Sequence, residues 1–153
     1  MLTIPDILNP RHVLLNLQTS NGDEAIQQVA SLLRQDERVR DWVGFYNSLK
    51  DRALCVETKA EFQICIAHTR TDCVSNMVMS VGRCQEPIPF PGGGAPVRYI
   101  FCIGLPKEMA AEYLRIIGSI ARFFKDPVMI QRLNAVISAQ EFIAILGEKE
   151  MAL

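Results

Sequence analysis

The chain has 153 residues, a length that fits one domain able to bury a substantial core. Its formal net charge of −1 provides no basic excess, so we do not expect a nucleic-acid partner. No run reaches the roughly 18 to 20 apolar residues of a membrane-spanning helix, and Asp6 and Asn9 stand where a secretory signal needs an apolar core. The sequence therefore predicts a cytoplasmic protein without stable membrane insertion.

The first half of the chain predicts short elements in alternation. Residues 5–8 indicate a turn or short helix, and residues 12–17 indicate a strand. A helix is predicted to begin at 20–23, since apolar residues recur after it with helical spacing. A second helix is predicted across 39–54, and residues 55–61 fit either a loop or an irregular strand.

The middle of the chain predicts strands. Residues 62–67, 77–82 and 97–103 are the three clearest, because they are short apolar runs bounded by polar or turn-forming residues. Residues 85–96 contain four prolines and three glycines and predict a loop, with the glycine run 92–94 at its tip.

The last third predicts helices. An apolar stripe after Pro106 indicates one helix, and Asp126 followed by Pro127 is typical of the start of the next. Ser138 and Glu141 have the spacing of a capping box before a final short helix. With neither an internal repeat nor a linker, the order of elements predicts a single α/β domain.

Cysteine and histidine content restricts the chemistry. The number of cysteines is odd and no C-x-x-C pair occurs, so neither a disulfide framework nor a zinc ribbon is expected, and most thiols are predicted to be buried. A histidine-based metal site would need His12 and His68 to converge, so we expect no metal and no cofactor. The cysteines are Cys55, Cys65, Cys73, Cys84 and Cys102.

His68 is the strongest candidate for chemistry, because it ends the apolar strand 62–67 and is followed by polar residues. A histidine there is expected at a rim, where a neutral imidazole can accept a proton, a metal or a phosphoryl group. Arg70 is a candidate cation for an anionic group, whereas Cys65 should lie on the opposite face of the strand. From local sequence alone, a structural or surface histidine remains the alternative.

Three stretches in order resemble a known family. Gln63–Arg70 resembles a strand of the form G-I-A-I-P-H-G-R, and residues 86–101 resemble "E-P-I-x-F … P-V-x-x-x-F". The third stretch comprises residues 114–127 followed by 138–142. Over nearly its whole length the chain resembles phosphotransferase-system IIA domains of the fructose, mannitol and nitrogen-regulatory type.

The resemblance implies a fold and a function. The fold is a single-domain sandwich over residues 1–153, with a central mixed β-sheet flanked by helices on both sides. The function is that of a bacterial phosphohistidine carrier of the phosphoenolpyruvate-dependent phosphotransferase system, in sugar transport or nitrogen regulation. His68 would accept phosphate from an HPr-type phosphocarrier protein, then pass it to a IIB domain or signal to a regulatory target protein. The partner surface would surround His68 and include exposed apolar residues.

The resemblance also implies site residues. Arg52 matches an arginine upstream of the family's histidine, and Tyr113 falls where the family has a second active-site histidine. Phosphate-stabilising roles are implied for positively charged and hydroxyl side chains near them. The implied set is His68 as phosphoryl acceptor, Arg52 and Tyr113 beside it, and Arg70, Thr69 and Thr58 as phosphate-binding residues.

Departures from the family pattern keep an alternative open. Residues 59–63 replace a glycine-rich turn, Ala67 and Thr69 replace a proline and a glycine beside the histidine, and Tyr113 is uncharged near neutral pH. The alternative is a phosphorylation-deficient regulatory protein-interaction module on the same fold. Whether the chain is a catalytic phosphotransferase component depends on which of the two holds.

Overall fold

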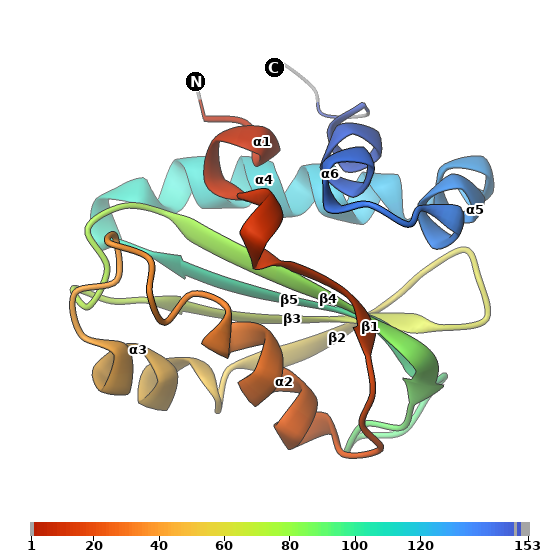
Figure 1. Ribbon diagram of the computed structural model, residues 1–153, viewed down its shortest axis with the longest axis horizontal. Helices are drawn as coiled ribbons and strands as arrows, with labels where there is room; N and C mark the ends of the chain where they lie inside the picture. The colour runs from red at the N-terminus through yellow and green to blue at the C-terminus, as the bar shows by residue number, and fades with distance from the viewer. Residues whose placement is uncertain (1, 149, 151–153) are drawn as a thin grey trace.

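The computed structural model describes residues 2–148 and 150, and one five-stranded mixed sheet lies at its centre (Figure 1). In chain order the strands are β1 (Val13–Leu17), β2 (Ala53–Glu57), β3 (Gln63–Arg70), β4 (Val78–Ile88) and β5 (Val97–Leu105). Their order in the sheet is β1-β4-β5-β3-β2. β1 runs parallel to β4 and β3 runs parallel to β5, whereas the β4–β5 and β2–β3 pairs are antiparallel.

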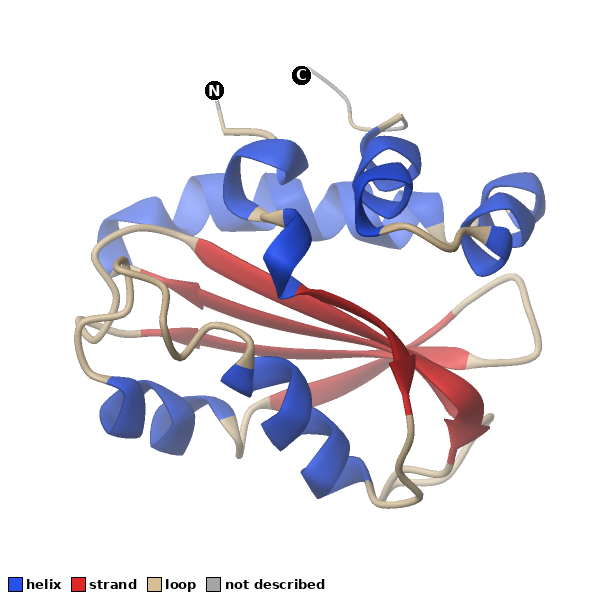
Figure 2. Ribbon diagram, in the orientation of Figure 1, coloured by secondary structure: helices blue, strands red, loops and turns tan. Residues whose placement is uncertain are grey.

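Helices cover both faces of the sheet, as Figure 2 shows, so the predicted sandwich is confirmed. The α-helices are α1 (Ile4–Ile7), α2 (Gly22–Ser31), α3 (Trp42–Leu49), α4 (Ala110–Phe123), α5 (Pro127–Ala135) and α6 (Ala139–Gly147), with 3₁₀ turns η1 (Pro10–His12) and η2 (Lys107–Met109). α2 and α3 lie on one face, and α1, α4, α5 and α6 lie on the other. Within the described part of the chain, every helix is too short or too polar to span a bilayer.

Alternation along β3 divides the core into two layers. Ile64 and Ile66 pack into the apolar cluster under α4, whereas Cys65 and Ala67 pack into the cluster against α2 and α3. Because successive side chains of a strand point to opposite faces, His68 follows Ile64 and Ile66 on the α4 face. The same alternation places Cys65 away from His68, as predicted.

Three predicted helix starts are confirmed by their caps. The side chains of Asn21, Asp126 and Ser138 each accept a hydrogen bond from a backbone N–H in the first turn of α2, α5 and α6. Pro127 begins α5, where its missing N–H costs no helix hydrogen bond. The sequence signals therefore set where these helices begin.

The helix predicted across 39–54 is wrong in its second half. α3 ends at Leu49, and β2 begins at Ala53. Leu54 and Val56 belong to a strand, because the chain pairs antiparallel with β3 and its side chains alternate in direction. A half-exposed edge strand carries few buried apolar residues, so its sequence signal is weak.

Two predicted boundaries also move. The loop predicted from residue 85 begins after Ile88, because β4 continues along β5 to that residue. β3 extends through Arg70, so the chain does not leave the core at Thr69, which is almost completely buried. The glycine run is confirmed as part of the loop, with positive φ at 92–94 that only glycine adopts freely.

Candidate functional site

A cavity opens where β3 and β5 end side by side. Because these strands are parallel neighbours, with Arg70 opposite Leu105, their carboxyl ends meet at one edge of the sheet, near the start of α4. The cavity has a volume of about 390 Å³. Its lining consists of Arg52, His68, Thr69, Arg70, Lys107, Ala110, Tyr113 and Leu114, so it brings together five of the six predicted site residues.

His68 reaches this cavity from β3 as a half-buried side chain. Its Nδ1 atom is buried and has no hydrogen-bond partner in the described part of the chain. Nε2 is therefore the ring nitrogen left to meet a reactant. Burial, and then the positive charge of Arg52, lowers the pKa of His68 below its ordinary value. The ring is consequently neutral at pH 7 and retains a lone pair for nucleophilic attack.

Tyr113 reaches the cavity from α4 and lies against His68. The two ring centroids are 5.1 Å apart with an angle of 27° between the planes, a stacked arrangement. Burial raises the pKa of the Tyr113 phenol, so its hydroxyl remains protonated at neutral pH and can donate a hydrogen bond. At the position where the resemblance implies a second histidine, this chain thus has an uncharged hydrogen-bond donor beside the imidazole.

Arg52 is held opposite His68 by the β2–β3 pairing. Ala53 faces Ala67 in the register, so Arg52 faces His68, and the backbone N–H of His68 donates to the carbonyl oxygen of Arg52 at 3.3 Å. Arg70 lies two residues beyond His68 on the same strand and therefore on the same face.

Lys107 is the site residue that sequence reasoning missed. It follows β5 by two residues, in η2, and adds a third cation to Arg52 and Arg70. The described lining contains no carboxylate, so the charged side chains around His68 are all positive. Such a cavity suits a phosphoryl group, whose oxygens carry negative charge. Lys107 comes near His68 only because β3 pairs in parallel with β5, and the sequence alone did not establish that pairing.

Thr69 lines the cavity, but its side chain does not point into it. The Thr69 hydroxyl hydrogen-bonds with that of Ser48 in α3, on the opposite face of the sheet. Alternation along β3 is the cause, since neighbours of His68 face the other way. The Thr69 hydroxyl therefore contacts Ser48, and the implied contact of this hydroxyl with phosphate is corrected.

Thr58 lies away from the cavity, which corrects its implied role. Its hydroxyl donates to the carbonyl of Phe62 at 2.6 Å and accepts from the N–H of Ala60 at 3.1 Å, within the turn between β2 and β3. This turn is at the start of β3, whereas His68 is near its end. Thr58 therefore stabilises the turn that replaces the family's glycines.

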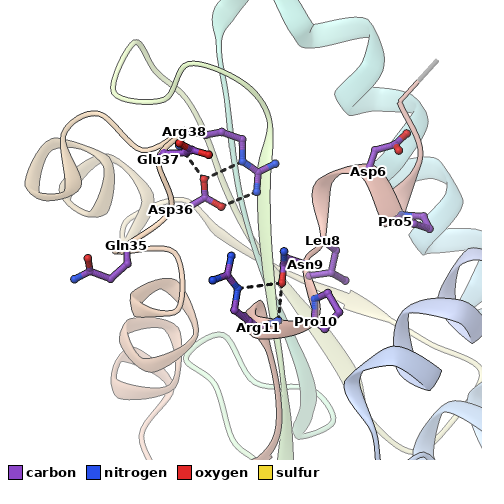
Figure 3. Close-up of a pocket in the computed structure, with 10 residues that line it drawn as sticks. All are labelled: Pro5, Asp6, Leu8, Asn9, Pro10, Arg11, Gln35, Asp36, Glu37 and Arg38. Carbon is purple, nitrogen blue, oxygen red and sulfur yellow. Dashed lines mark hydrogen bonds and ion pairs between the residues drawn. The ribbon is translucent and has the colours of Figure 1, made fainter.

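A second cavity, of about 490 Å³, lies between the α1–η1 segment and the chain after α2 (Figure 3). Its central charges neutralise one another: Arg38 donates to both carboxylate oxygens of Asp36, which lowers the pKa of that carboxyl. Arg11 contacts Asn9 in the same view. The described lining of this cavity contains neither a histidine nor a cysteine, and its Asp36–Arg38 ion pair joins neighbouring residues of the chain after α2.

His12 is buried, with Nδ1 at 3.8 Å from Oδ2 of Asp36. Burial lowers the pKa of His12, and the charge of Asp36 opposes that shift. His12 precedes β1, which β4 and β5 separate from β3, so the two histidines do not share a site.

Leu114 lines the His68 cavity and is 68% exposed. Leu54 of β2 is 59% exposed and lines a separate cavity, which also contains Cys55. Leu54 lies two residues from Arg52 and thus on the same face of the hairpin. Apolar side chains around a cationic cavity are typical of a surface that another protein covers.

Comparison with known proteins gives one family. The family described as "Phosphoenolpyruvate-dependent sugar phosphotransferase system, EIIA 2" matches residues 6–149. A nitrogen regulatory protein of Bradyrhizobium diazoefficiens is 25% identical in an alignment 151 residues long that covers 95% of each chain.

Solved structures of the same fold agree with this match. The nitrogen regulatory protein IIA-Ntr from Neisseria meningitidis has a TM-score of 0.78 at 25% identity, over 92% of this chain and 97% of its own. The enzyme IIA of a mannitol IIA–IIB complex from Escherichia coli has a TM-score of 0.68 at 17% identity, over 92% and 98%.

Proposed function

This chain belongs to the phosphoenolpyruvate-dependent sugar phosphotransferase system EIIA 2 family, as its motifs predicted, and we propose that it is a phosphohistidine carrier whose acceptor is His68. One observation carries the proposal: the only histidine in the cavity at the end of β3 is neutral and half-buried among cations, in a described lining without a carboxylate. Such a site favours a negatively charged group bonded to a neutral ring nitrogen.

The proposed step is a transfer between two ring nitrogens. Nε2 of His68 attacks the phosphorus of a phosphohistidine on an HPr-type carrier protein, so one P–N bond forms while the other breaks and the carrier's imidazole leaves. The equatorial oxygens meet Arg52, Arg70 and Lys107, and the Tyr113 hydroxyl donates a hydrogen bond to one of them. Positioning and charge do most of the work in such transfers, since the step needs little covalent machinery.

The phosphoryl group then leaves by one of two routes. A cysteine thiolate of a IIB domain attacks it, or the phosphorylated surface is read by a regulatory target protein. Support for a IIB partner comes from the mannitol system, where a protein of this fold is in complex with phosphorylated enzyme IIB. Leu114 and Leu54 are the exposed apolar residues that we assign to the partner surface.

The nitrogen-regulatory branch is the favoured setting. Two curated relatives, which this chain matches over 95% of its length, are both named nitrogen regulatory protein. We therefore propose a regulator whose output is the phosphorylation state of His68, rather than a component dedicated to the uptake of one sugar.

A second candidate function keeps the fold and the partner surface but does not include phosphoryl transfer. Tyr113 supplies no positive charge where the family's second histidine is implied, and residues 59–63 lack the family's glycines. On that ground the alternative is a regulatory interaction module that does not accept phosphate.

A measurement of intact mass distinguishes the phosphohistidine carrier from the interaction module. The protein is incubated with phosphoenolpyruvate, enzyme I and either HPr or the nitrogen-branch carrier, then measured under alkaline conditions that preserve phosphohistidine. The carrier proposal predicts the gain of one phosphoryl group in the parent protein and in His12→Asn, and no gain in His68→Ala. No gain in the folded parent protein with either carrier would favour the interaction module.

A further inference from the structure

Two of the five cysteines face each other across the β2–β3 hairpin. Cys55 pairs with Cys65 in the antiparallel register, and both pack into the cluster on the α2–α3 face. Both are free thiols, and they lie near enough for each to influence the pKa of the other. Nothing in the proposed phosphoryl transfer uses this pair, which lies on the face of the sheet opposite His68.

The hydrogen-bond pattern of the hairpin sets the distance between them. The bond from the His68 N–H to the Arg52 carbonyl makes that pair a hydrogen-bonded one. Hydrogen-bonded and non-hydrogen-bonded pairs alternate along antiparallel strands, so Cys55 and Cys65, three pairs further on, are non-hydrogen-bonded. In such pairs the Cα atoms are about 4.5 Å apart, within the range that a disulfide spans.

The other cysteines do not offer Cys65 an equivalent partner. Cys102 on β5 is opposite Ala67, two residues along β3 from Cys65. That offset, with the spacing between strands, separates the two Cα atoms by roughly 8 Å, too far for a disulfide without backbone movement. Cys73 lies outside the strands, beside Asp41, and Cys84 is on β4, which β5 separates from β3.

One member of the pair is open to small reactants. Cys55 is half-buried and lines a cavity of about 380 Å³, whereas Cys65 is completely buried. An oxidant therefore meets Cys55 first, with Cys65 in position to resolve the product. Lys50 and Asp23 line the same cavity, so their opposite charges offset each other there, and burial raises the pKa of the Cys55 thiol.

We propose that Cys55 and Cys65 form a redox-active pair that a peroxide converts into a cross-strand disulfide. The Cys55 thiolate attacks one peroxide oxygen, the O–O bond breaks, and the sulfur becomes a sulfenic acid, while the other oxygen leaves as hydroxide and takes up the proton that Cys55 lost to form water. The Cys65 sulfur then attacks that of Cys55, and the hydroxyl leaves as water with the Cys65 proton. Two thiols are oxidised by two electrons, and hydrogen peroxide is reduced to two waters. The product fastens edge strand β2 to β3, three residues from Arg52.

Peptide mapping tests the proposal in the full-length protein. Cleavage after lysine and arginine places Cys55 on peptide 53–59 and Cys65 on peptide 60–70, and each remaining cysteine on a peptide of its own. After exposure to hydrogen peroxide and alkylation of free thiols, we expect peptides 53–59 and 60–70 to be joined. The intact mass should fall by two hydrogens and return on reduction.

Two cysteine variants test which thiols form the disulfide. Cys55→Ser should abolish the loss of two hydrogens, whereas Cys73→Ser, which removes the other half-buried thiol, should leave it unchanged. Burial raises the pKa of both paired thiols, so the oxidation should become faster from pH 7 to pH 9. Five unlinked peptides after oxidation of the folded parent protein, or a link between any other two, would overturn the proposal without any variant having to fold.

Discussion

The ring of Tyr113 stacks on the ring of His68, with centroids 5.1 Å apart and 27° between the planes. The contact joins α4 to β3, and it puts a protonated phenol next to the imidazole at the rim of the cavity. A tyrosine in this place orients the ring by packing and can donate a hydrogen bond, but it contributes no charge. In the proposed phosphoryl transfer, the electrostatic stabilisation would therefore come from the three cations around the cavity.

Removing only the hydroxyl tests the donor role. Tyr113→Phe keeps the stacked ring, so His68 should keep its orientation while a charge-assisted hydrogen bond is lost. A bond of that kind is worth about 1.5–3 kcal/mol, and we expect phosphorylation of His68 to slow on the order of 10- to 100-fold. Rapid-quench measurement of phosphoprotein against time gives the rate. If Tyr113→Phe keeps the parent rate and only Tyr113→Ala slows, the ring acts by packing and the donor role is contradicted.

Arg52 should act on His68 in two measurable ways. Its charge lowers the pKa of His68, so Arg52→Gln should raise that pKa towards the ordinary value of about 6.5. The same change should slow phosphorylation, because one cation near the phosphoryl oxygens is lost. An NMR titration of the imidazole and the rate assay measure the two effects. Arg34→Gln, which removes an exposed arginine of the chain after α2, is the matched control. An unchanged His68 pKa in folded Arg52→Gln would contradict the assigned proximity.

Lys107 should contribute as the third cation. Lys107→Met keeps much of the side-chain length while removing the charge, and we expect slower phosphorylation by a folded protein of unchanged thermal stability. Lys59→Met removes an exposed lysine at the distant end of β3 and should keep the parent rate. Equal rates in the two variants would remove Lys107 from the phosphate-binding set.

Much of the fold was predictable because local signals agree with the tertiary structure. Asn21, Asp126 and Ser138 cap the helices that they were predicted to start, and the apolar runs of β3, β4 and β5 are strands. The edge strand β2 was assigned partly to a helix, since Leu54 follows the apolar residues of α3 and has little burial of its own.

The sequence predicted only those site residues that share one strand or that the family resemblance implies. His68 and Arg70 share β3, so period-two alternation places them together. Lys107 depends on the pairing of β3 with β5, which is a long-range contact that no local pattern reports. Thr58 was included through the resemblance alone, and the structure places it in the β2–β3 turn, at the opposite end of β3 from His68.

Acid should destabilise the protein through its two histidines. Burial lowers the pKa of both His12 and His68, whereas in the unfolded chain each titrates near 6.5. Between the lowered value and 6.5 the unfolded state binds more protons, so stability falls as the pH drops through this window. Urea midpoints at pH 7.5 and 5.5 measure the loss, which should be smaller in His12→Asn. The low pKa of Asp36 acts only at lower pH, near the carboxyl range. An identical pH dependence in the variant would contradict a buried, neutral His12.

The most direct measurement is the nitrogen that carries phosphate. Long-range ¹H–¹⁵N correlation of the phosphorylated protein, kept alkaline, distinguishes phosphorylation at the two ring nitrogens of a histidine. The account predicts one phosphohistidine, at Nε2 of His68, because Nδ1 is buried and Nε2 is left to the cavity. Phosphate at Nδ1, on His12, or on no residue of the folded protein would contradict the assignment of His68 as the acceptor in this cavity.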